Sequence, residues 1–280
     1  MKKQGMLMII MAIVLLFLIV IASIFAPLLT VYDPIEGDSS QRFLPPNKEH
    51  LLGTDHFGRD IFARILYGAR ITLPVSFTAL FLTAVVGVVL GIISAMNFNK
   101  PVDVVIMTLV DVLLAVPFLV VAMAVCAIFG RGLENVLIVV VAVWWAPFAR
   151  YTRSLVLSLK NSQMVLSAMV LGASYPVIVF REILPNIFTS LFIYLTFEFG
   201  NLILTLSTLS FFGMGIKPPL PEWGNMISDG RSYMTQSYHM LLWPIVAIII
   251  TVLALNLLGE GLRDFSNPYD TLATEMEDVK

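Results

Sequence analysis

MLMIIMAIVLLFLIVIASIFAPLL, residues 6–29, is an uncharged apolar stretch close to the start of the chain. The hydrocarbon core of a bilayer is about 30 Å thick and takes about 20 apolar residues of α-helix to cross. The stretch also exceeds the core of a cleaved signal peptide, about 7 to 15 residues, so we expect it to stay in the membrane. Five further predominantly apolar stretches with few charges lie at 75–96, 104–129, 134–157, 189–212 and 240–262. The sequence therefore predicts an all-α, polytopic membrane protein with six transmembrane helices.

The composition agrees with this prediction and excludes other classes of protein. Hydrophobic residues make up 58% of the 280 residues and charged residues only 13%, whereas about a quarter of the residues in a soluble domain are charged. The formal net charge of -2 leaves no excess of basic side chains to neutralise phosphates, so nucleic acid is not expected as a partner. Cys126, the one cysteine, cannot form an internal disulfide and is expected to pack or face lipid as a small apolar side chain.

The spans also predict a topology. An even number of spans places both ends of the chain on one side of the membrane, and Lys2 and Lys3 before the first span favour the cytoplasm. The chain then divides into an N-terminal helix with an external amphipathic segment (1–74), a transmembrane core (75–264) and a short acidic cytoplasmic tail (265–280).

Two external connections link the predicted spans. In the first, an interfacial helix is expected to present apolar and charged side chains on opposite faces: Ile61, Ile65 and Leu66 against Arg59, Asp60 and Arg64. The second, 213–239, contains KPPLPEWG, whose prolines predict a rigid loop with Trp223 as an interfacial anchor. The three histidines, His50, His56 and His239, lie in these connections and are expected to be solvated, too scattered for a metal site.

Motifs of catalysis are absent from the sequence. It has no GxxxxGK[ST] phosphate loop, no HExxH zinc helix and no GxSxG nucleophile elbow. We therefore predict no catalytic residue and no metal ligand, which argues against an intramembrane enzyme. If transport is driven by nucleotide hydrolysis, the ATPase must be another chain.

A stretch between the fourth and fifth spans, 161–188, is apolar but too rich in charges and helix breakers for a lipid-facing helix. We call it the elbow. A short helix (Met164 to Leu171) is expected to end at Gly172, which can adopt positive φ. Ser174 can then cap a second helix that runs to Leu184 and is stopped by Pro185. The elbow thus offers a docking surface on the cytoplasmic side.

The elbow also carries a resemblance to a known family. LGASYPVIVFREILPN (171–186) resembles the EAA loop of bacterial ABC importer permeases, whose glycine and terminal Leu-Pro match Gly172, Leu184 and Pro185. LLGTDHFGRDIFARILYGARITL (51–73), LSFFGMGIKPPLPEWGNMISDGR (209–231) and ALNLLGEGLRDFSNP (254–268) are similar to segments of the C-type permeases of dipeptide, oligopeptide and nickel importers. The four blocks occur in the expected order and cover nearly the whole chain.

The resemblance implies a function and a set of partners. The chain would be a permease in the bacterial inner membrane, with a second homologous permease, favoured as a heterodimer, two ATP-binding subunits that hold ATP and Mg, and an extracytoplasmic substrate-binding protein. This chain itself would need no cofactor, and membrane lipid would surround it. The coupling residues implied in the elbow are Ser167, Ala168, Gly172, Ala173, Ser174, Arg181, Leu184 and Pro185. Leu166-Ser167-Ala168 departs from the Glu-Ala-Ala of the motif, which removes an acidic partner for the ATPase.

Polar residues within the spans are candidates for the translocation pathway, because they are costly in lipid. They are Asp111 and Glu198, with Asn201 and Thr205 on one face with Glu198. Interhelical hydrogen bonding is the alternative role. An ion-coupled secondary transporter using Asp111 or Glu198 is the alternative function, although no inverted repeat is visible.

The sequence leaves the cargo open. Leu206 stands where many peptide permeases have a glutamate, so peptides and nickel or metal chelates are both retained. Small residues in the spans are expected to serve packing instead: Gly87 and Gly91 form a GxxxG pattern, and Gly259 and Gly261 lie near the end of the last span.

Overall fold

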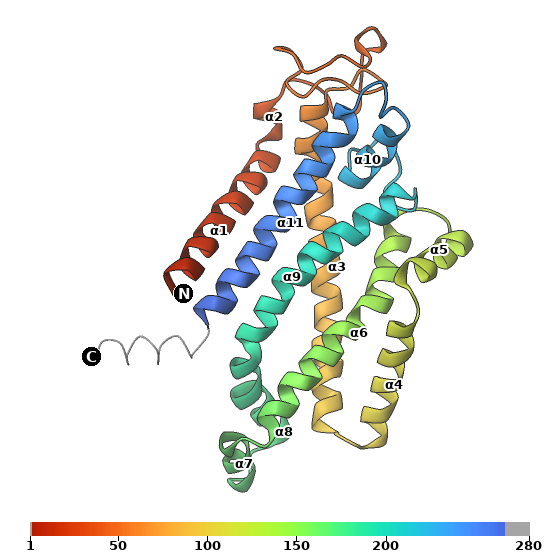
Figure 1. Ribbon diagram of the computed structural model, residues 1–280. Coiled ribbons are helices and arrows are strands. Elements are labelled where there is room, and N and C mark those ends of the chain that lie inside the picture. The colour runs from red at the N-terminus through yellow and green to blue at the C-terminus, as the bar shows by residue number, and fades with distance from the viewer. Residues whose placement is uncertain (1, 267–280) are drawn as a thin grey trace. The chain divides into compact units, whose positions relative to one another are not determined.

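The computed structural model describes residues 2–266 (Figure 1). The predicted acidic tail lies, from residue 267 on, outside the described residues. The regular elements in residues 2–266 are helical, with a 3-10 turn at Ser39–Gln41 and a π-helical turn at Ile178–Ile183. The α-helices are α1 (Lys2–Ile24), α2 (Ala26–Leu29), α3 (Ile61–Met96), α4 (Pro101–Ala115), α5 (Phe118–Phe129), α6 (Leu133–Lys160), α7 (Gln163–Val170), α8 (Tyr175–Val177), α9 (Leu184–Phe211), α10 (Trp223–Arg231) and α11 (His239–Phe265).

Five helices in the described part of the chain are long and apolar enough to cross a membrane, and the number rises to six if a bent pair of helices is counted as one span. The all-α polytopic fold is therefore confirmed. The bent pair is α4 and α5, which meet at 87°, so the predicted span 104–129 is not one straight helix. Val116 between them is extended, at φ −96° and ψ 129°, because the ring of Pro117 disfavours helical backbone at the preceding residue.

The second span begins earlier than its apolar pattern indicates. Helix α3 runs without interruption for 36 residues from Ile61, so the expected interfacial helix is wrong. Both of its predicted faces are covered: Ile61 and Leu66 are buried, and so are the charged residues Arg59 and Arg64. Helical periodicity correctly predicted an apolar and a charged face. The surrounding connections, however, bury the charged face too.

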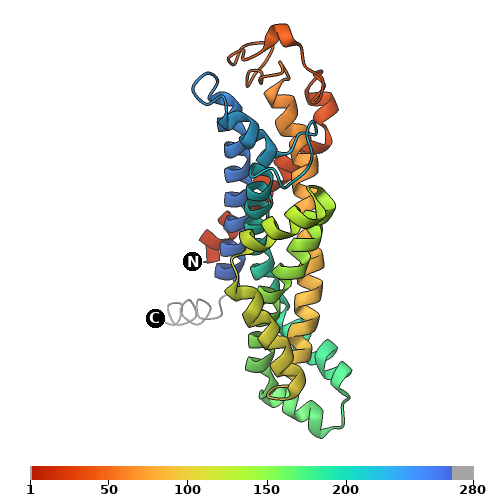
Figure 2. The same cartoon turned by 90° about the vertical axis from the view of Figure 1, so that its right-hand side faces the viewer.

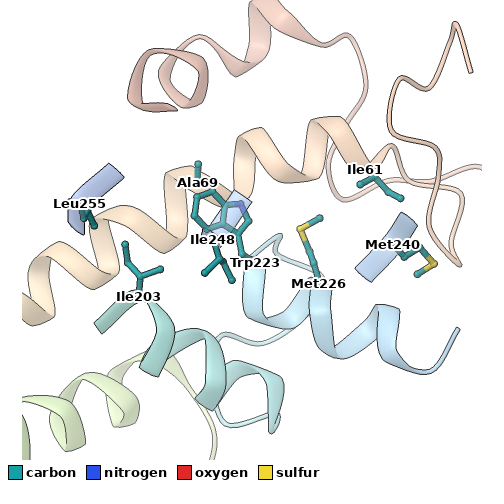
Figure 3. Packing of buried hydrophobic residues seen from close by; sticks show 8 residues of the cluster. All are labelled: Ile61, Ala69, Ile203, Trp223, Met226, Met240, Ile248 and Leu255. Carbon is teal, nitrogen blue, oxygen red and sulfur yellow. The ribbon is translucent and has the colours of Figure 1, made fainter. Parts of the chain in front are cut away.

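The chain divides into two compact units, and we describe each by itself. The first comprises the residues up to Thr78, Val125–Val136 and the residues from Thr196 onward. Its core surrounds the indole of Trp223 and contains Ile61, Ala69, Ile203, Met226, Met240, Ile248 and Leu255 (Figure 3). Trp223 is therefore not the interfacial anchor that its neighbourhood of glycines and prolines predicted.

Helices α1 and α11 lie side by side in this unit (Figure 1). A methyl group added at Gly261 would lie 2.8 Å from the carbonyl oxygen of Gly5. A methyl group added at Gly259 would lie 2.5 Å from the hydroxyl of Thr196. The two glycines thus allow close helix packing, as predicted.

The second unit comprises Ala79–Ala124 and Leu137–Leu195. Here α3 packs on α6 through the predicted GxxxG pattern: a Cβ at Gly87 would collide with Phe148, and one at Gly91 would lie 2.6 Å from the carbonyl oxygen of Ala149. The expected close approach is confirmed. Cys126 lies in the first unit and is buried. It therefore packs inside the protein, which was one of the two environments expected for it.

Candidate functional site

The elbow contains the predicted turn, and its geometry is a Schellman motif. Figure 2 shows the backbone of this stretch in green, at the bottom of the view. Ser162 caps α7 by accepting a hydrogen bond from the backbone N–H of Val165. At the other end, Gly172 has φ +79°, its N–H donates to the carbonyl of Met169, and the N–H of Ala173 donates to that of Ala168. These two bonds satisfy carbonyls that a helix end otherwise leaves unpaired. A local signal therefore fixes the turn.

The base of the elbow is tied to the helices of its own unit. A buried cluster joins Val165, Ile178 and Ile183 of the elbow to Ala95 of α3 and Val156 of α6. The ammonium of Lys160 donates to the carbonyl oxygens of Ala95 at 3.1 Å and Met96 at 3.4 Å. A cation here also complements the partial negative charge at the C-terminus of α3.

The outer side of the elbow is apolar and uncovered. The side chains next to the turn, Val170 and Leu171, are 87% and 86% exposed, and Phe180 and Tyr175 are exposed as well. A methyl group at Gly172 would meet nothing within 4 Å. Of the predicted coupling residues, the exposed ones are Ser167, Gly172, Ser174, Arg181 and Pro185, and the half-buried ones are Ala168, Ala173 and Leu184.

Two local predictions for the elbow are wrong. The Ser174 side chain makes no capping hydrogen bond, and Pro185 does not end the second helix, because Tyr175–Phe211 is one continuous span candidate. The backbone passes through the π-helical turn Ile178–Ile183 just before Pro185. In this turn the N–H of Leu184 donates to the carbonyl of Val179, which widens the helix where a proline ring would otherwise clash.

A buried carboxylate in the second unit forms an ion pair that the sequence did not predict. Asp103 is 2% exposed, and its carboxylate accepts two hydrogen bonds from the guanidinium of Arg153, at 2.8 and 2.9 Å. The hydroxyl of Ser94 and the backbone N–H of Asn99 complete its partners, at 2.5 and 3.0 Å. The carboxylate thus links α3, α4 and α6. Its partners are distant in sequence, so no local pattern indicated the pairing.

The predicted pathway residues fall in both units. Glu198, Asn201 and Thr205 lie on α9 in the first unit, and Asp111 lies on α4 in the second. Glu198 is buried and accepts a hydrogen bond from the Asn201 amide at 3.4 Å. The hydroxyl of Thr205 donates to the backbone carbonyl of Asn201 at 2.8 Å. Asp111 is exposed and forms an ion pair with Arg150 of α6.

The connections 30–60 and 213–239, which we call the polar cap, correct the prediction for the histidines. All three are buried. The His50 imidazole pairs with Asp60 at 2.9 Å and with Gln41 at 3.0 Å. His239 lies 3.0 Å from the hydroxyl of Ser237, and the ring of His56 stacks on Tyr233. Within residues 2–266 no three His, Cys, Asp or Glu side chains are grouped so that they could hold a metal ion.

Asp55 and Arg59 of the polar cap, and Arg64 of the adjoining first turn of α3, are charged residues that are buried and paired. The guanidinium of Arg59 donates to the Asp55 carboxylate at 2.6 Å, and Arg64 approaches the same carboxylate at 3.5 Å. Burial raises the pKa of Asp229, and the Arg59 and Arg64 guanidinium groups oppose that shift. Burial also lowers the pKa of His56, because it disfavours the imidazolium.

The expected rigid loop 213–239 contains α10, which Glu222 caps. Its carboxylate accepts hydrogen bonds from the backbone N–H groups of Gly224 and Asn225, at 2.8 and 2.9 Å. Burial raises the pKa of Glu222, and these two bonds counteract it. The indole N–H of Trp223 donates to the carbonyl of Ile65 at 3.1 Å and so ties α10 to α3.

The family model described as binding-protein-dependent transport system inner membrane component matches residues 87–269. The chain belongs to this family. Three relatives are similar over most of their own length as well. A putative peptide transport system permease protein of Brucella suis is 39% identical over 255 residues, 91% of this chain and 86% of that protein. A dipeptide transport system permease protein of Alkalihalophilus pseudofirmus is 39% identical over 266 residues, 95% of this chain and 87% of that protein.

The third relative is a glutathione transport system permease protein of Pectobacterium atrosepticum, 42% identical over 224 residues, 80% of this chain and 74% of that protein. With the family and the helical fold, these relatives identify the chain as a permease subunit of an ABC importer of the peptide family. It is a multi-pass protein of the bacterial inner membrane. As a permease component, it is one subunit of a larger importer and is not itself the catalyst.

Proposed function

We propose that the permease carries short peptides across the inner membrane and forms half of their pathway. The names of three relatives support this proposal, because they specify peptide, dipeptide and glutathione transport. A second permease of the same family would form the other half of the pathway, in a heterodimer. Nickel or metal chelates are the other cargo that the sequence left open.

The energy for transport comes, in this proposal, from two separate ATP-binding subunits, which hold ATP and Mg²⁺. The permease sequence contains no phosphate-binding loop of its own. An extracytoplasmic binding protein delivers the cargo, which agrees with the family's description as a binding-protein-dependent system. The permease then requires no cofactor.

The single observation that carries the mechanism is the uncovered apolar turn of the elbow. Val170 and Leu171, at 87% and 86% exposed, flank a glycine with no neighbour within 4 Å. Exposed apolar side chains on a defined turn are typical of a protein interaction site. The ATP-binding subunit would cover this turn, with the exposed Arg181 as a charged contact.

Closure of the ATP-binding subunits would move the elbow, and the elbow would move the helices attached to it. The buried cluster of Val165, Ile178 and Ile183 gives it a firm attachment to α3 and α6. Rigid-body gating of this kind produces alternating access. The polar residues Glu198, Asn201, Thr205 and Asp111 would line the pathway that opens.

The experiment that tests this function is uptake into proteoliposomes that contain the permease with its co-encoded subunits and binding protein. Labelled dipeptide and a labelled nickel chelate are compared, with and without ATP. Leu171→Asp places a charge in the apolar contact and is expected to reduce ATP-dependent dipeptide uptake at least about tenfold, the effect of about 1.4 kcal/mol. Asn161→Asp is the control, since it adds the same charge at an exposed polar position of the elbow.

The outcomes separate the alternatives. Equal uptake by the two variants would contradict the elbow mechanism, and ATP-dependent uptake of the nickel chelate alone would contradict peptide cargo. Uptake driven by an ion gradient without any ATP-binding subunit would contradict the importer mechanism and support an ion-coupled transporter. Co-purification of the subunits shows whether each variant still assembles.

A further inference from the structure

The Asp111–Arg150 ion pair joins two helices that are candidate parts of membrane spans. Asp111 lies on α4 and Arg150 on α6, and both belong to the second unit. Their side chains are 69% and 51% exposed. This pair differs from Asp103–Arg153, whose carboxylate is buried against three neighbouring partners.

The pair lies about three turns from one end of each helix, and Asp111 is four residues from the other end of α4, Ala115. Asp111 follows Pro101, the first residue of α4, by ten residues, and Arg150 precedes Lys160, the last residue of α6, by ten. At about 1.5 Å per residue, both backbones lie about 15 Å from those helix ends. This distance is about half of a hydrocarbon core of about 30 Å.

Other polar side chains extend the pair into a stripe. Thr108, three residues before Asp111, is exposed on α4, and Ser154 and Ser158, four and eight residues after Arg150, are exposed on α6. Residues spaced by three or four lie on one face of a helix. We call these three residues and the ion pair the polar stripe.

Lipid is a poor neighbour for the polar stripe, because a charged side chain near the bilayer centre costs at least about 2.5 kcal/mol. The charges neutralise each other, but their exposed surfaces still require water or polar groups. A face of this kind fits an aqueous pathway, the same role that the sequence predicted for Asp111.

We propose that the Asp111–Arg150 pair binds the two charged ends of a peptide in transit. This inference rests on the proposed function and specifies its cargo as zwitterionic. The Asp111 carboxylate accepts hydrogen bonds from the peptide's ammonium group, and the Arg150 guanidinium donates two to its carboxylate. Without cargo the two side chains pair with each other, so neither charge stays isolated. Binding replaces the one internal ion pair by two with the cargo, so the lost Asp111–Arg150 contact offsets part of the attraction, which favours passage over tight binding.

The first test asks whether water reaches the polar stripe. In a Cys126→Ala background, which removes the one native thiol, Thr108→Cys is compared with Leu109→Cys in the assembled importer. Both positions are exposed in the permease and differ by one residue in depth, but they lie on different faces of α4. A hydrophilic methanethiosulfonate reagent should modify Thr108→Cys about tenfold faster, and a saturating dipeptide should slow this reaction. Equal rates would overturn the proposal.

The second test uses one dipeptide in four forms: free, N-acetylated, amidated at its C-terminus, and blocked at both ends. Uptake by each variant is divided by wild-type uptake of the same form, which cancels the preference of the binding protein. The neutral double variant Asp111→Asn/Arg150→Gln should lose about tenfold for the free dipeptide and less than about twofold for the doubly blocked form. This variant leaves no unpaired charge, so it avoids a folding defect from an isolated ion.

Single variants assign the two ends. Asp111→Asn should reduce uptake of the free and amidated forms, whereas Arg150→Gln should reduce uptake of the free and N-acetylated forms. Equal loss for all four forms in the double variant would overturn the proposal and make the pair a structural contact. In that case ATP-dependent uptake of the free dipeptide by the wild type would still support the proposed function.

Discussion

Asp55 and Arg59 of the polar cap, with Arg64 at the start of α3, carry charges that are buried and paired. The elbow instead leaves the apolar side chains of Val170 and Leu171 uncovered. The two regions therefore reverse the usual relation between polarity and exposure. Removal of one partner from a buried pair leaves the other charge buried without compensation, which is costly. The uncovered apolar surface of the elbow has no partner within the permease, so its contribution to transport must be measured in the assembled importer. We expect substitutions in the cap to reduce stability and substitutions on the elbow surface to reduce transport.

Among the substitutions that test this comparison, Asp55→Ala should cause the largest loss of unfolding free energy. The substitution leaves the Arg59 and Arg64 guanidinium groups buried without their shared carboxylate, a loss of about 3 to 5 kcal/mol in unfolding free energy. Unfolding of the purified importer in detergent measures it. The exposed Glu36→Ala in the same connection should change that free energy by less than about 0.5 kcal/mol. Similar losses in the two variants would contradict a tightly paired cap.

Two glycines with positive φ sharpen the comparison, because one is crowded and the other is open. Gly58 in the cap has φ +78°, and Gly172 in the elbow has φ +79°. A Cβ at Gly58 would collide with the carbonyl of Asp38, while one at Gly172 meets nothing within 4 Å. Gly172→Ala should cost about 1 kcal/mol from backbone strain alone, and Gly58→Ala about 3 kcal/mol because overpacking adds to it. Unfolding of the two variants in detergent tests this order, and the reverse order would contradict it.

The smallest effect should be a pH dependence of the stability of the polar cap. Burial lowers the pKa of His56 from its ordinary value of 6.5, Asp55 and Asp229 oppose that shift, and Arg59 and Arg64 assist it. Below pH 6.5 the unfolded chain binds a proton at this position that the folded chain does not, so acidification favours unfolding. Burial raises the pKa of Asp229 above its ordinary value of 3.8. At pH values just above 3.8 the folded chain therefore binds a proton that the unfolded chain does not, so at this group acidification favours folding.

The measurement is the thermal unfolding midpoint of the importer from pH 7.5 down to the folded-state pKa of His56. The wild-type midpoint should fall as the pH decreases through 6.5, and His56→Gln should reduce this fall. An unchanged slope in His56→Gln would assign the acid sensitivity to other groups.

Local sequence features predicted the spans and the elbow turn. A bilayer requires long apolar helices, so hydropathy alone located the membrane-crossing segments, including the apolar anchor 6–29 that became α1. The turn at Gly172 was equally predictable, because a Schellman motif uses hydrogen bonds within six residues. Pro117 was a local signal too, and it could have predicted the break between α4 and α5.

The remaining features depend on contacts between distant segments. Trp223 looked like an interfacial anchor because glycines and prolines surround it in sequence, yet it packs against α3, more than a hundred residues earlier. The histidines seemed solvated because their neighbours are polar, but partners such as Tyr233 for His56 cover them. The ion pair of Arg150 with Asp111 likewise depends on how α4 packs against α6. The sequence therefore identified Asp111 as a candidate but not its partner Arg150.

The π-helical turn Ile178–Ile183 gives the elbow an adjustable register. In this turn the N–H of Leu184 donates to the carbonyl of Val179, five residues earlier, whereas an α-helical bond reaches back four residues. A change from π-helical to α-helical bonding displaces the adjoining helix by one residue, about 1.5 Å along its axis and about 100° around it. A push on Val170 and Leu171 could thus be converted into rotation of the following helix while its interior hydrogen bonds stay intact.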